Sequence, residues 1–172
     1  MKPIAVRLVP HDPAWAARAQ TEIARIMAAV PALVGIEHIG STAIPGIPAK
    51  PILDLLGTGT SLAALEASRA VFATLGYAWH GEYGLAGRRY LTSDDPETGK
   101  RRVQLHCYAR GDPGLARHVA FRDLLRRDAA LAAEYGAMKQ RCSQRHPEDD
   151  HAYSDCKDAW IKRVEALALT AG

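Results

Sequence analysis

A glycine-serine turn followed by a strand with one acid constrains this chain more than any other feature. Gly40 and Ser41 stand in a turn ahead of the segment Pro51 to Gly57, which carries Asp54. Glycine lets backbone N–H groups approach an anion closely, and the Ser41 hydroxyl adds a hydrogen-bond donor. A carboxylate on the following strand can hold a divalent cation that bridges phosphate oxygens. The layout therefore predicts a site for phosphate groups.

The turn and its strand acid resemble the nucleotidyltransferase fold, in which Gly-Ser precedes an Asp-x-Asp strand. Further short elements follow one another along nearly the whole chain in the order of the GrpB family: His11-Asp12-Pro13-Ala14-Trp15, His38 to Asp54, Gly87-Arg88-Arg89, Leu105-His106, Phe121 to Arg126, Tyr135 with Lys139, and Tyr153 with Lys157. The chain therefore resembles GrpB proteins. This resemblance implies an α+β (α/β) fold, a nucleotidyltransferase-like mixed β-sheet with flanking helices and a helical C-terminal third.

The chain departs from the wider fold at the second acid of the Asp-x-Asp pair. Residues two apart in a strand share a face, so that acid belongs at position 56, where this chain has Leu56. His106, on the polar face of the alternating segment Arg102 to Tyr108, offers a replacement ligand, although imidazole favours Zn, Ni or Fe over Mg. We expect Asp54 and His106 as the catalytic and metal-binding residues, with Mg²⁺ or Mn²⁺ as cation. A solvated sheet face is the alternative explanation for His106.

Polar and basic residues around the turn are the expected ligands for phosphate: Gly40, Ser41, Thr42, Lys50, Arg88, Arg89 and Lys139. Neighbours on a strand point to opposite faces, so only one of Arg88 and Arg89 easily faces the site. Lys139 belongs to the Tyr-x-x-x-Lys element of the resemblance, and an ordinary exposed helical lysine is the alternative. A solvated helix face is expected for three further arginines, Arg122, Arg126 and Arg127, with contact between Arg122 and the ligand as the alternative.

Composition limits the class of protein. A chain of 172 residues with 48% apolar content is long enough for one well-buried core, so we expect a single domain over residues 1–172. Lys and Arg total 22 against 19 acids without clustering, which does not favour a nucleic-acid partner. No segment approaches the roughly 18 apolar residues of a membrane span, and no signal peptide is evident, so cytoplasmic is the expected location and no membrane partner is expected. The odd cysteine count predicts buried thiols without a disulfide framework or zinc site.

Periodicity and turn signals give the expected elements. Strands are expected at Ile4–Val9, Gly35–Ile39, Pro51–Gly57, Tyr77–His80, Arg88–Thr92 and Arg101–Tyr108, the last two joined by a polar hairpin loop. Helices are expected from Pro13 to Val30, with Asp12 as the cap, and from Leu62 to Leu75. Two apolar stripes at helical spacing follow in the C-terminal third: Leu131, Tyr135, Met138 and Cys142, then Tyr153, Cys156, Trp160, Val164 and Leu167.

The leading hypothesis is a nucleotidyltransferase-like protein that binds a nucleoside triphosphate, or a related phosphorylated small molecule, between the sheet and the C-terminal helices. If the site is catalytic, it transfers a nucleotidyl group with a divalent cation. The alternative is a non-catalytic nucleotide-sensing or protein-interaction domain. Because GrpB-like domains also occur fused to dephospho-CoA kinases, the resemblance connects that alternative to an auxiliary role in coenzyme A biosynthesis. The sequence has no P-loop, dinucleotide-binding or nucleophile-elbow motif.

Overall fold

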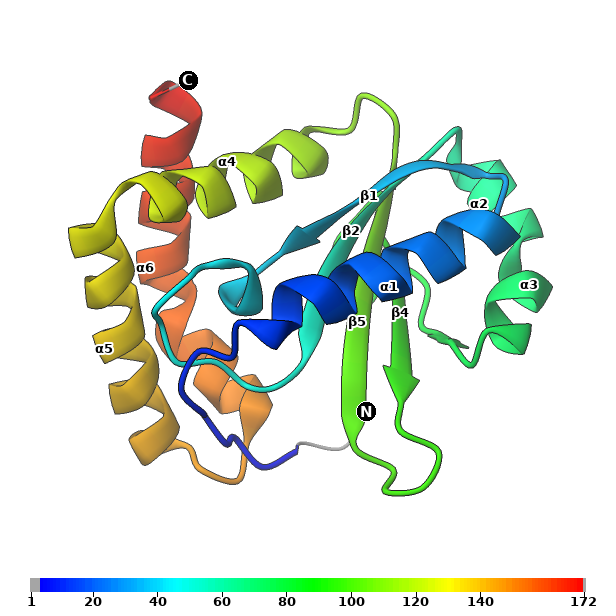
Figure 1. Ribbon diagram of the computed structural model, residues 1–172. Helices are drawn as coiled ribbons and strands as arrows, with labels where there is room; N and C mark the ends of the chain where they lie inside the picture. The colour runs from blue at the N-terminus through cyan, green and yellow to red at the C-terminus, as the bar shows by residue number, and fades with distance from the viewer. Residues whose placement is uncertain (1–3, 172) are drawn as a thin grey trace.

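The computed structural model describes residues 4–171 and contains a mixed five-stranded sheet with helices packed on both faces (Figure 1). The strands are β1 (Leu33–Ile39), β2 (Leu53–Gly59), β3 (Ala78–Trp79), β4 (Arg89–Asp94) and β5 (Arg101–Ala109), in the spatial order β1-β2-β5-β4-β3. The central pair, β2 and β5, is parallel, and the other neighbouring pairs are antiparallel. The expected α+β fold with a mixed sheet is therefore confirmed. The ends of the expected domain, Met1 to Pro3 and Gly172, lie outside the described residues.

One face of the sheet is covered by the N-terminal helix and two short helices, α1 (Ala14–Ala29), α2 (Leu62–Ala67) and α3 (Arg69–Thr74). As predicted, Asp12 stands at the start of α1, where its carboxylate accepts the backbone N–H of Ala14 at 2.9 Å. Helix and strand side chains form the core on this face: Trp15, Ala19, Ile26, Leu65 and Phe72 meet Leu53, Leu55, Val103, Leu105 and Cys107. The alternation predicted for β5 is confirmed on this side.

The opposite face carries the three C-terminal helices, α4 (Pro113–Arg127), α5 (Ala129–Arg145) and α6 (Asp150–Thr170). Each begins directly after an aspartate whose carboxylate accepts backbone N–H groups of the first turn, namely Asp112, Asp128 and Asp149. Helix α4 packs on the sheet through Leu115 and Val119, which contact Leu56 and Tyr108. Helices α5 and α6 stand beside α4 at the left of Figure 1.

Two predicted elements differ from the structure. Residues Ile4 to Val9 do not form a sheet strand, because the segment bonds to two loops instead: Val6 N–H donates to Pro147 O in the loop between α5 and α6, and Val9 forms an isolated bridge with Ala49 ahead of β2. The expected helix from Leu62 to Leu75 is interrupted at Ser68, whose hydroxyl donates to Ala64 O. A side chain that bonds back to the preceding turn competes with the helix and bends it.

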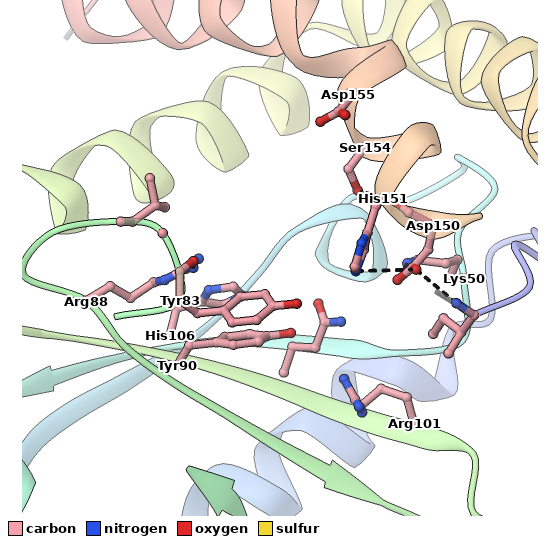
Figure 2. A pocket seen from close by; sticks show the side chains of 14 residues that line it. Lys50, Tyr83, Arg88, Tyr90, Arg101, His106, Asp150, His151, Ser154 and Asp155 are labelled. Atoms are coloured by element: carbon pink, nitrogen blue, oxygen red, sulfur yellow. Dashed lines mark hydrogen bonds and ion pairs between the residues drawn. The ribbon is translucent and has the colours of Figure 1, made fainter. Parts of the chain in front are cut away.

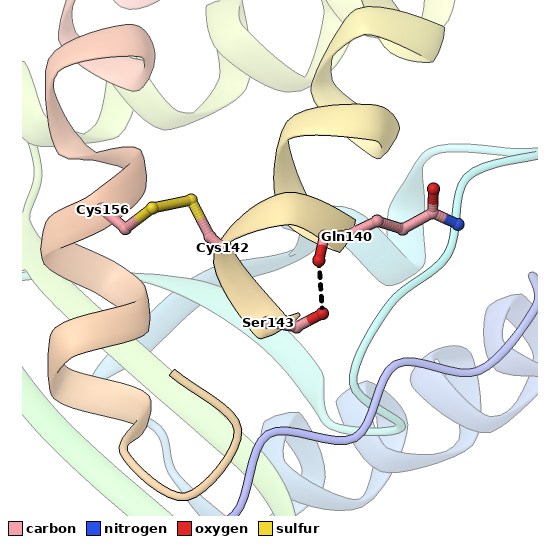
Figure 3. Close-up of a disulfide and its surroundings, with 4 residues drawn as sticks. All are labelled: Gln140, Cys142, Ser143 and Cys156. Carbon is pink, nitrogen blue, oxygen red and sulfur yellow. Dashed lines mark hydrogen bonds between the residues drawn. A yellow bond between two sulfur atoms is a disulfide. The ribbon is translucent and has the colours of Figure 1, made fainter. Parts of the chain in front are cut away.

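The prediction of three free thiols is wrong for two cysteines. Cys142 of α5 and Cys156 of α6 form a disulfide, with their Cα atoms 5.9 Å apart (Figure 3). The helices are neighbours, so residues separated by 14 positions in the sequence come together. Cys107 is a buried free thiol, as predicted. The apolar stripe of α6 is also shorter than expected, because Leu167 is half exposed.

Candidate functional site

The glycine-serine turn lies at the end of β1 and enters a short 3₁₀ helix, η1 (Ser41–Ala43). Gly40 has φ +70°, a conformation that glycine adopts without strain. The turn is fixed from within by His38, whose Nε2 lies 2.8 Å from the Thr42 hydroxyl oxygen. Burial lowers the pKa of His38 to about 4, so this imidazole is neutral at pH 7. Thr42 therefore holds the turn in shape as well as bordering the cavity beside it.

Asp54 projects from β2 toward the C-terminal helices, directly behind the turn. Its carboxylate is packed against Gly40 and remains 29% exposed. His106 of β5 lies beside it, with its Nε2 3.5 Å from Asp54 Oδ1. Leu56, two residues further along β2, is 3% exposed under α4. The position of the missing second acid is therefore apolar and sealed.

Three lysines from different segments reach the cavity in front of Asp54. Lys50 precedes β2, Lys139 comes from α5, and Lys157 comes from α6. The cavity has a volume of about 160 Å³. Its described lining combines the turn, the acid, the lysines and two tyrosines: Gly40, Ser41, Thr42, Lys50, Ile52, Asp54, Gln104, Tyr135, Lys139, Tyr153, Ser154 and Lys157. We call it the lysine cavity.

The lysine side chains are held in place by an aromatic ring, one backbone oxygen and one carboxylate. Lys139 is 2% exposed, and its Nζ donates to Pro48 O at 2.5 Å. The Nζ of Lys157 lies 4.0 Å from the Tyr153 ring centroid, and that of Lys50 lies 5.7 Å from the same ring. Lys50 Nζ is also 4.0 Å from Asp150 Oδ2. The ammonium groups are therefore directed by their surroundings before any ligand arrives.

Burial of the lysines and their mutual repulsion favour the binding of negative charge in the cavity. Desolvation lowers the pKa of Lys157 to about 7, and repulsion by Lys50 acts in the same direction while Asp54 opposes it. Desolvation likewise lowers the pKa of Lys139 well below its ordinary value, with repulsion by Lys157 as a further cause. Among the described lining residues Asp54 is the one carboxylate beside the three amines, and Asp150 contacts Lys50 from outside this cavity. An anion bound in the cavity stabilises the protonated, positively charged form of these lysines.

The donor set does not fit a divalent metal ion. Mg²⁺ and Mn²⁺ prefer several carboxylate or carbonyl oxygens, whereas this cavity offers one carboxylate beside three lysine side chains, whose nitrogens are poor ligands for such cations. Among residues 4–171, no cluster of three or more His, Cys, Asp or Glu side chains could hold a metal. The arrangement can bind phosphate or another compact anion through hydrogen bonds and charge.

A second, larger cavity of about 470 Å³ adjoins the lysine cavity and shares Lys50, Gln104 and Ser154 with it. It is bordered by His106 and Arg88, as Figure 2 shows. Arg88 Nε donates to Glu82 O, and Arg88 Nη2 donates to Tyr83 O.

Arg89 points elsewhere and pairs with Glu66, with 2.5 Å between Nε and Oε1. Glu82 Oε1 lies 3.7 Å from Arg89 Nη1 and accepts the backbone N–H of Gly87 at 2.8 Å. Six expected site residues therefore line the lysine cavity: Gly40, Ser41, Thr42, Lys50, Asp54 and Lys139. Two more, His106 and Arg88, line the adjoining cavity, and Arg89 lines neither of them.

Sequence reasoning missed Lys157, Gln104, Tyr135 and Tyr153 as cavity residues. A repeated motif could have indicated them. The spacing Tyr-x-x-x-Lys occurs twice, as Tyr135 with Lys139 and as Tyr153 with Lys157, and it places each pair on one helix face. The tyrosines are also core residues, as their apolar stripes predicted.

The predicted solvated face of α4 is wrong for Arg122, which is 9% exposed. Its Nη1 lies 2.6 Å from Glu37 Oε2 and donates to His38 O. Arg126 likewise donates to Ala43 O at 2.8 Å. These two arginines clamp α4 onto the strand and turn that lead to the site.

Comparison with known proteins identifies the family of this chain. A family profile described as GrpB protein matches residues 5–166. The chain belongs to the GrpB family. The UPF0157 protein YqkA of Bacillus subtilis is 36% identical over 164 residues, which cover 95% of this chain and 47% of YqkA. A protein named dephospho-CoA kinase from Mycolicibacterium paratuberculosis is 32% identical over 180 residues, covering 91% of this chain and 44% of that protein. The GrpB chain thus spans about half the length of these two relatives.

Solved structures agree with the assignment. The crystal structure of GrpB from Enterococcus faecalis superposes with a TM-score of 0.88 at 35% identity, covering 96% of this chain and 98% of that one. The Cid1 poly(U) polymerase in its MgGTP-bound form gives a TM-score of 0.53 at 11% identity over 79% of this chain and 44% of Cid1. The second likeness shows the fold alone, so this GrpB-family chain has a nucleotidyltransferase-type fold. Within residues 4–171, no helix combines the length and apolar content needed to cross a membrane.

Proposed function

We propose that this GrpB-family chain binds the phosphate groups of a nucleoside triphosphate, or of a related phosphorylated small molecule, in the lysine cavity. The observation that carries the proposal is the meeting of Lys50, Lys139 and Lys157 from three separate segments beside the Gly40-Ser41 turn. Buried ammonium groups are costly unless a negative partner joins them. A chain of phosphates supplies that partner, and the turn adds the Ser41 hydroxyl as a donor.

Binding is supported better than transfer. Metal-dependent nucleotidyl transfer uses carboxylates to hold cations that bridge phosphate oxygens, and this site has Leu56 where the second carboxylate would stand. The lysines supply positive charge at the place where a cation would otherwise act. In this arrangement the negative charge of Asp54 offsets part of the positive charge of the lysines when no ligand is bound. The packing of Asp54 against Gly40 also fixes the turn.

A non-catalytic, nucleotide-sensing domain is the second candidate, and the sealed Leu56 position is the observation that favours it. Relatives named dephospho-CoA kinase contain a region similar to this chain over less than half their length. A phosphate site of this kind would let the domain sense an adenine nucleotide such as coenzyme A or dephospho-CoA. Those compounds therefore belong in the ligand panel.

The first experiment is thermal unfolding with ATP, UTP, inorganic triphosphate, coenzyme A and dephospho-CoA, each with and without Mg²⁺ or Mn²⁺. A ligand at about 100 times its dissociation constant stabilises the folded state by about 2.7 kcal/mol, which raises Tm by roughly 5–10 °C for a chain of this size. We expect at least one phosphorylated compound to do this without a divalent cation.

Asp54→Asn separates anion binding from metal binding. The substitution removes a negative charge that repels phosphate, so the ligand-induced Tm rise should persist at equal or greater size. A metal-bridged site behaves in the opposite way, because the Tm rise would require a divalent cation and disappear in Asp54→Asn. No Tm rise with any phosphorylated compound would overturn the proposal.

A further inference from the structure

A stack of three aromatic rings forms one wall of the larger cavity. Tyr83 lies on Tyr90 with ring centroids 5.1 Å apart and an interplanar angle of 24°. Tyr90 in turn contacts His106, with centroids 5.2 Å apart. Tyr90 is 5% exposed, whereas Tyr83, at the outer end of the stack, is 41% exposed. One aromatic face is therefore supported from behind and open in front.

Tyr83 is held in this position at a conformational cost. Its φ of +46° is the only positive value of a non-glycine residue among those described. A non-glycine residue in this region costs about 1–2 kcal/mol and persists only where its surroundings fix it. Arg88 provides the fixing contacts, since its guanidinium donates to Glu82 O and Tyr83 O and lies 4.9 Å from the Tyr90 ring centroid. Packing alone gives no reason to strain a residue that stays exposed.

The open ring faces a cavity that continues into the lysine cavity. Figure 2 shows Tyr83 and Tyr90 on one side, and Lys50, Asp150 and His151 across the cavity from them. Lys50 borders both cavities, as do Gln104 and Ser154. The combined space thus has a positively charged end and an aromatic end. A ligand that fills both ends carries phosphates at one end and a flat apolar ring at the other.

We propose that Tyr83 is a stacking platform for the heteroaromatic base of a nucleotide whose phosphates occupy the lysine cavity. This inference rests on the proposed phosphate site and names the class of molecule that enters it. Stacking on an aromatic face tolerates every base, because each base has a π-face, so ATP and UTP should both bind. The polar side chains of His151, Ser154 and Asp155 line the same cavity.

Titration calorimetry with ATP and with inorganic triphosphate tests the platform. Inorganic triphosphate carries the charge but no base, so ATP should bind the wild type more tightly. Tyr83→Asn removes the ring and suits the left-handed backbone, since asparagine tolerates that conformation. We expect Tyr83→Asn to weaken ATP binding roughly tenfold and to leave triphosphate binding unchanged. Tyr83→Phe keeps the ring face and should retain wild-type affinity for both ligands.

Failure of the platform and failure of the phosphate site give different results. If triphosphate binds but ATP binds no more tightly, or if Tyr83→Asn weakens both ligands equally, the platform is overturned and the phosphate site stands. Retention of full ATP affinity in Tyr83→Asn also overturns the platform. If neither ligand binds the wild type, both proposals are overturned.

Discussion

A side chain on Gly40 would collide with Asp54, because a Cβ atom built on Gly40 lies 2.6 Å from Asp54 Oδ2 and 2.9 Å from Asp54 Cβ. The turn and the acid are therefore packed as one unit, in which glycine is required by space as well as by its φ of +70°. This contact ties the end of β1 to the face of β2 that opens into the lysine cavity.

Gly40→Ala should destabilise the fold more than a matched glycine substitution. Gly46 is the control, because it also has a positive φ, +81°, but no heavy atom lies within 4 Å of a Cβ built there. Alanine at Gly46 pays the backbone strain alone, about 1–2 kcal/mol. Alanine at Gly40 also meets Asp54, which adds at least about 1 kcal/mol. Urea denaturation measures both losses in the free energy of unfolding, and equal losses would contradict the close packing.

Leu56→Asp should not restore a metal site. Leu56 is 3% exposed and packed with Ile39 and Tyr108 under α4, so a carboxylate there loses its hydration. We expect a loss of about 3 kcal/mol or more in the free energy of unfolding.

Leu56→Met is the control for the Leu56 position, since a volume-conserving apolar change costs less than about 1.5 kcal/mol. Denaturation with and without Mn²⁺ checks the result. A stable Leu56→Asp protein that gains stability with Mn²⁺ would show that the position is open to the site.

The fold and half of the site could be predicted from the sequence for identifiable physical reasons. Alternation in β5 and the aspartate before α1 are local signals, and the structure confirms both. The lysine cavity depends on how α5 and α6 pack against β2, which no local pattern encodes. Lys139 was expected in the site through its Tyr-x-x-x-Lys element, but its burial, with only 2% exposed, depends on that packing. The Cys142–Cys156 pairing was likewise not visible in the sequence spacing.

The pH dependence of the free energy of unfolding should reveal the lowered pKa of the buried Lys157. The folded pKa of Lys157, about 7, lies below its ordinary value of 10.5. The unfolded chain therefore binds more protons at pH values between them, and the free energy of unfolding from this group rises with pH through that window.

Lys157→Met removes this pH dependence. The stability advantage of Lys157→Met over the wild type should therefore be largest near pH 7 and shrink toward pH 10. Urea denaturation at pH 7, 8.5 and 10 measures the difference, and a constant difference would show that Lys157 keeps an ordinary pKa in the folded state.

The disulfide should contribute measurable stability. It joins two helices across a sequence separation of 14 residues, and a closed loop of this length contributes about 3 kcal/mol. We expect the double variant Cys142→Ser with Cys156→Ser to lose about that amount in denaturant titrations.

Thiol counting under denaturing conditions provides the direct check of the bond. One thiol, from Cys107, should react before reduction and three after it. Three reactive thiols before reduction would contradict the bond.

Calorimetric titration of inorganic triphosphate into wild type, Lys157→Met and Lys162→Met tests the lysine cavity most directly. Lys157 and Lys162 both belong to α6, but Lys162 is exposed and pairs with Asp158. We expect Lys157→Met to bind triphosphate at least roughly tenfold more weakly, because it loses a charge-assisted hydrogen bond, while Lys162→Met binds like the wild type. Equal affinities in the two variants would contradict phosphate binding in the lysine cavity.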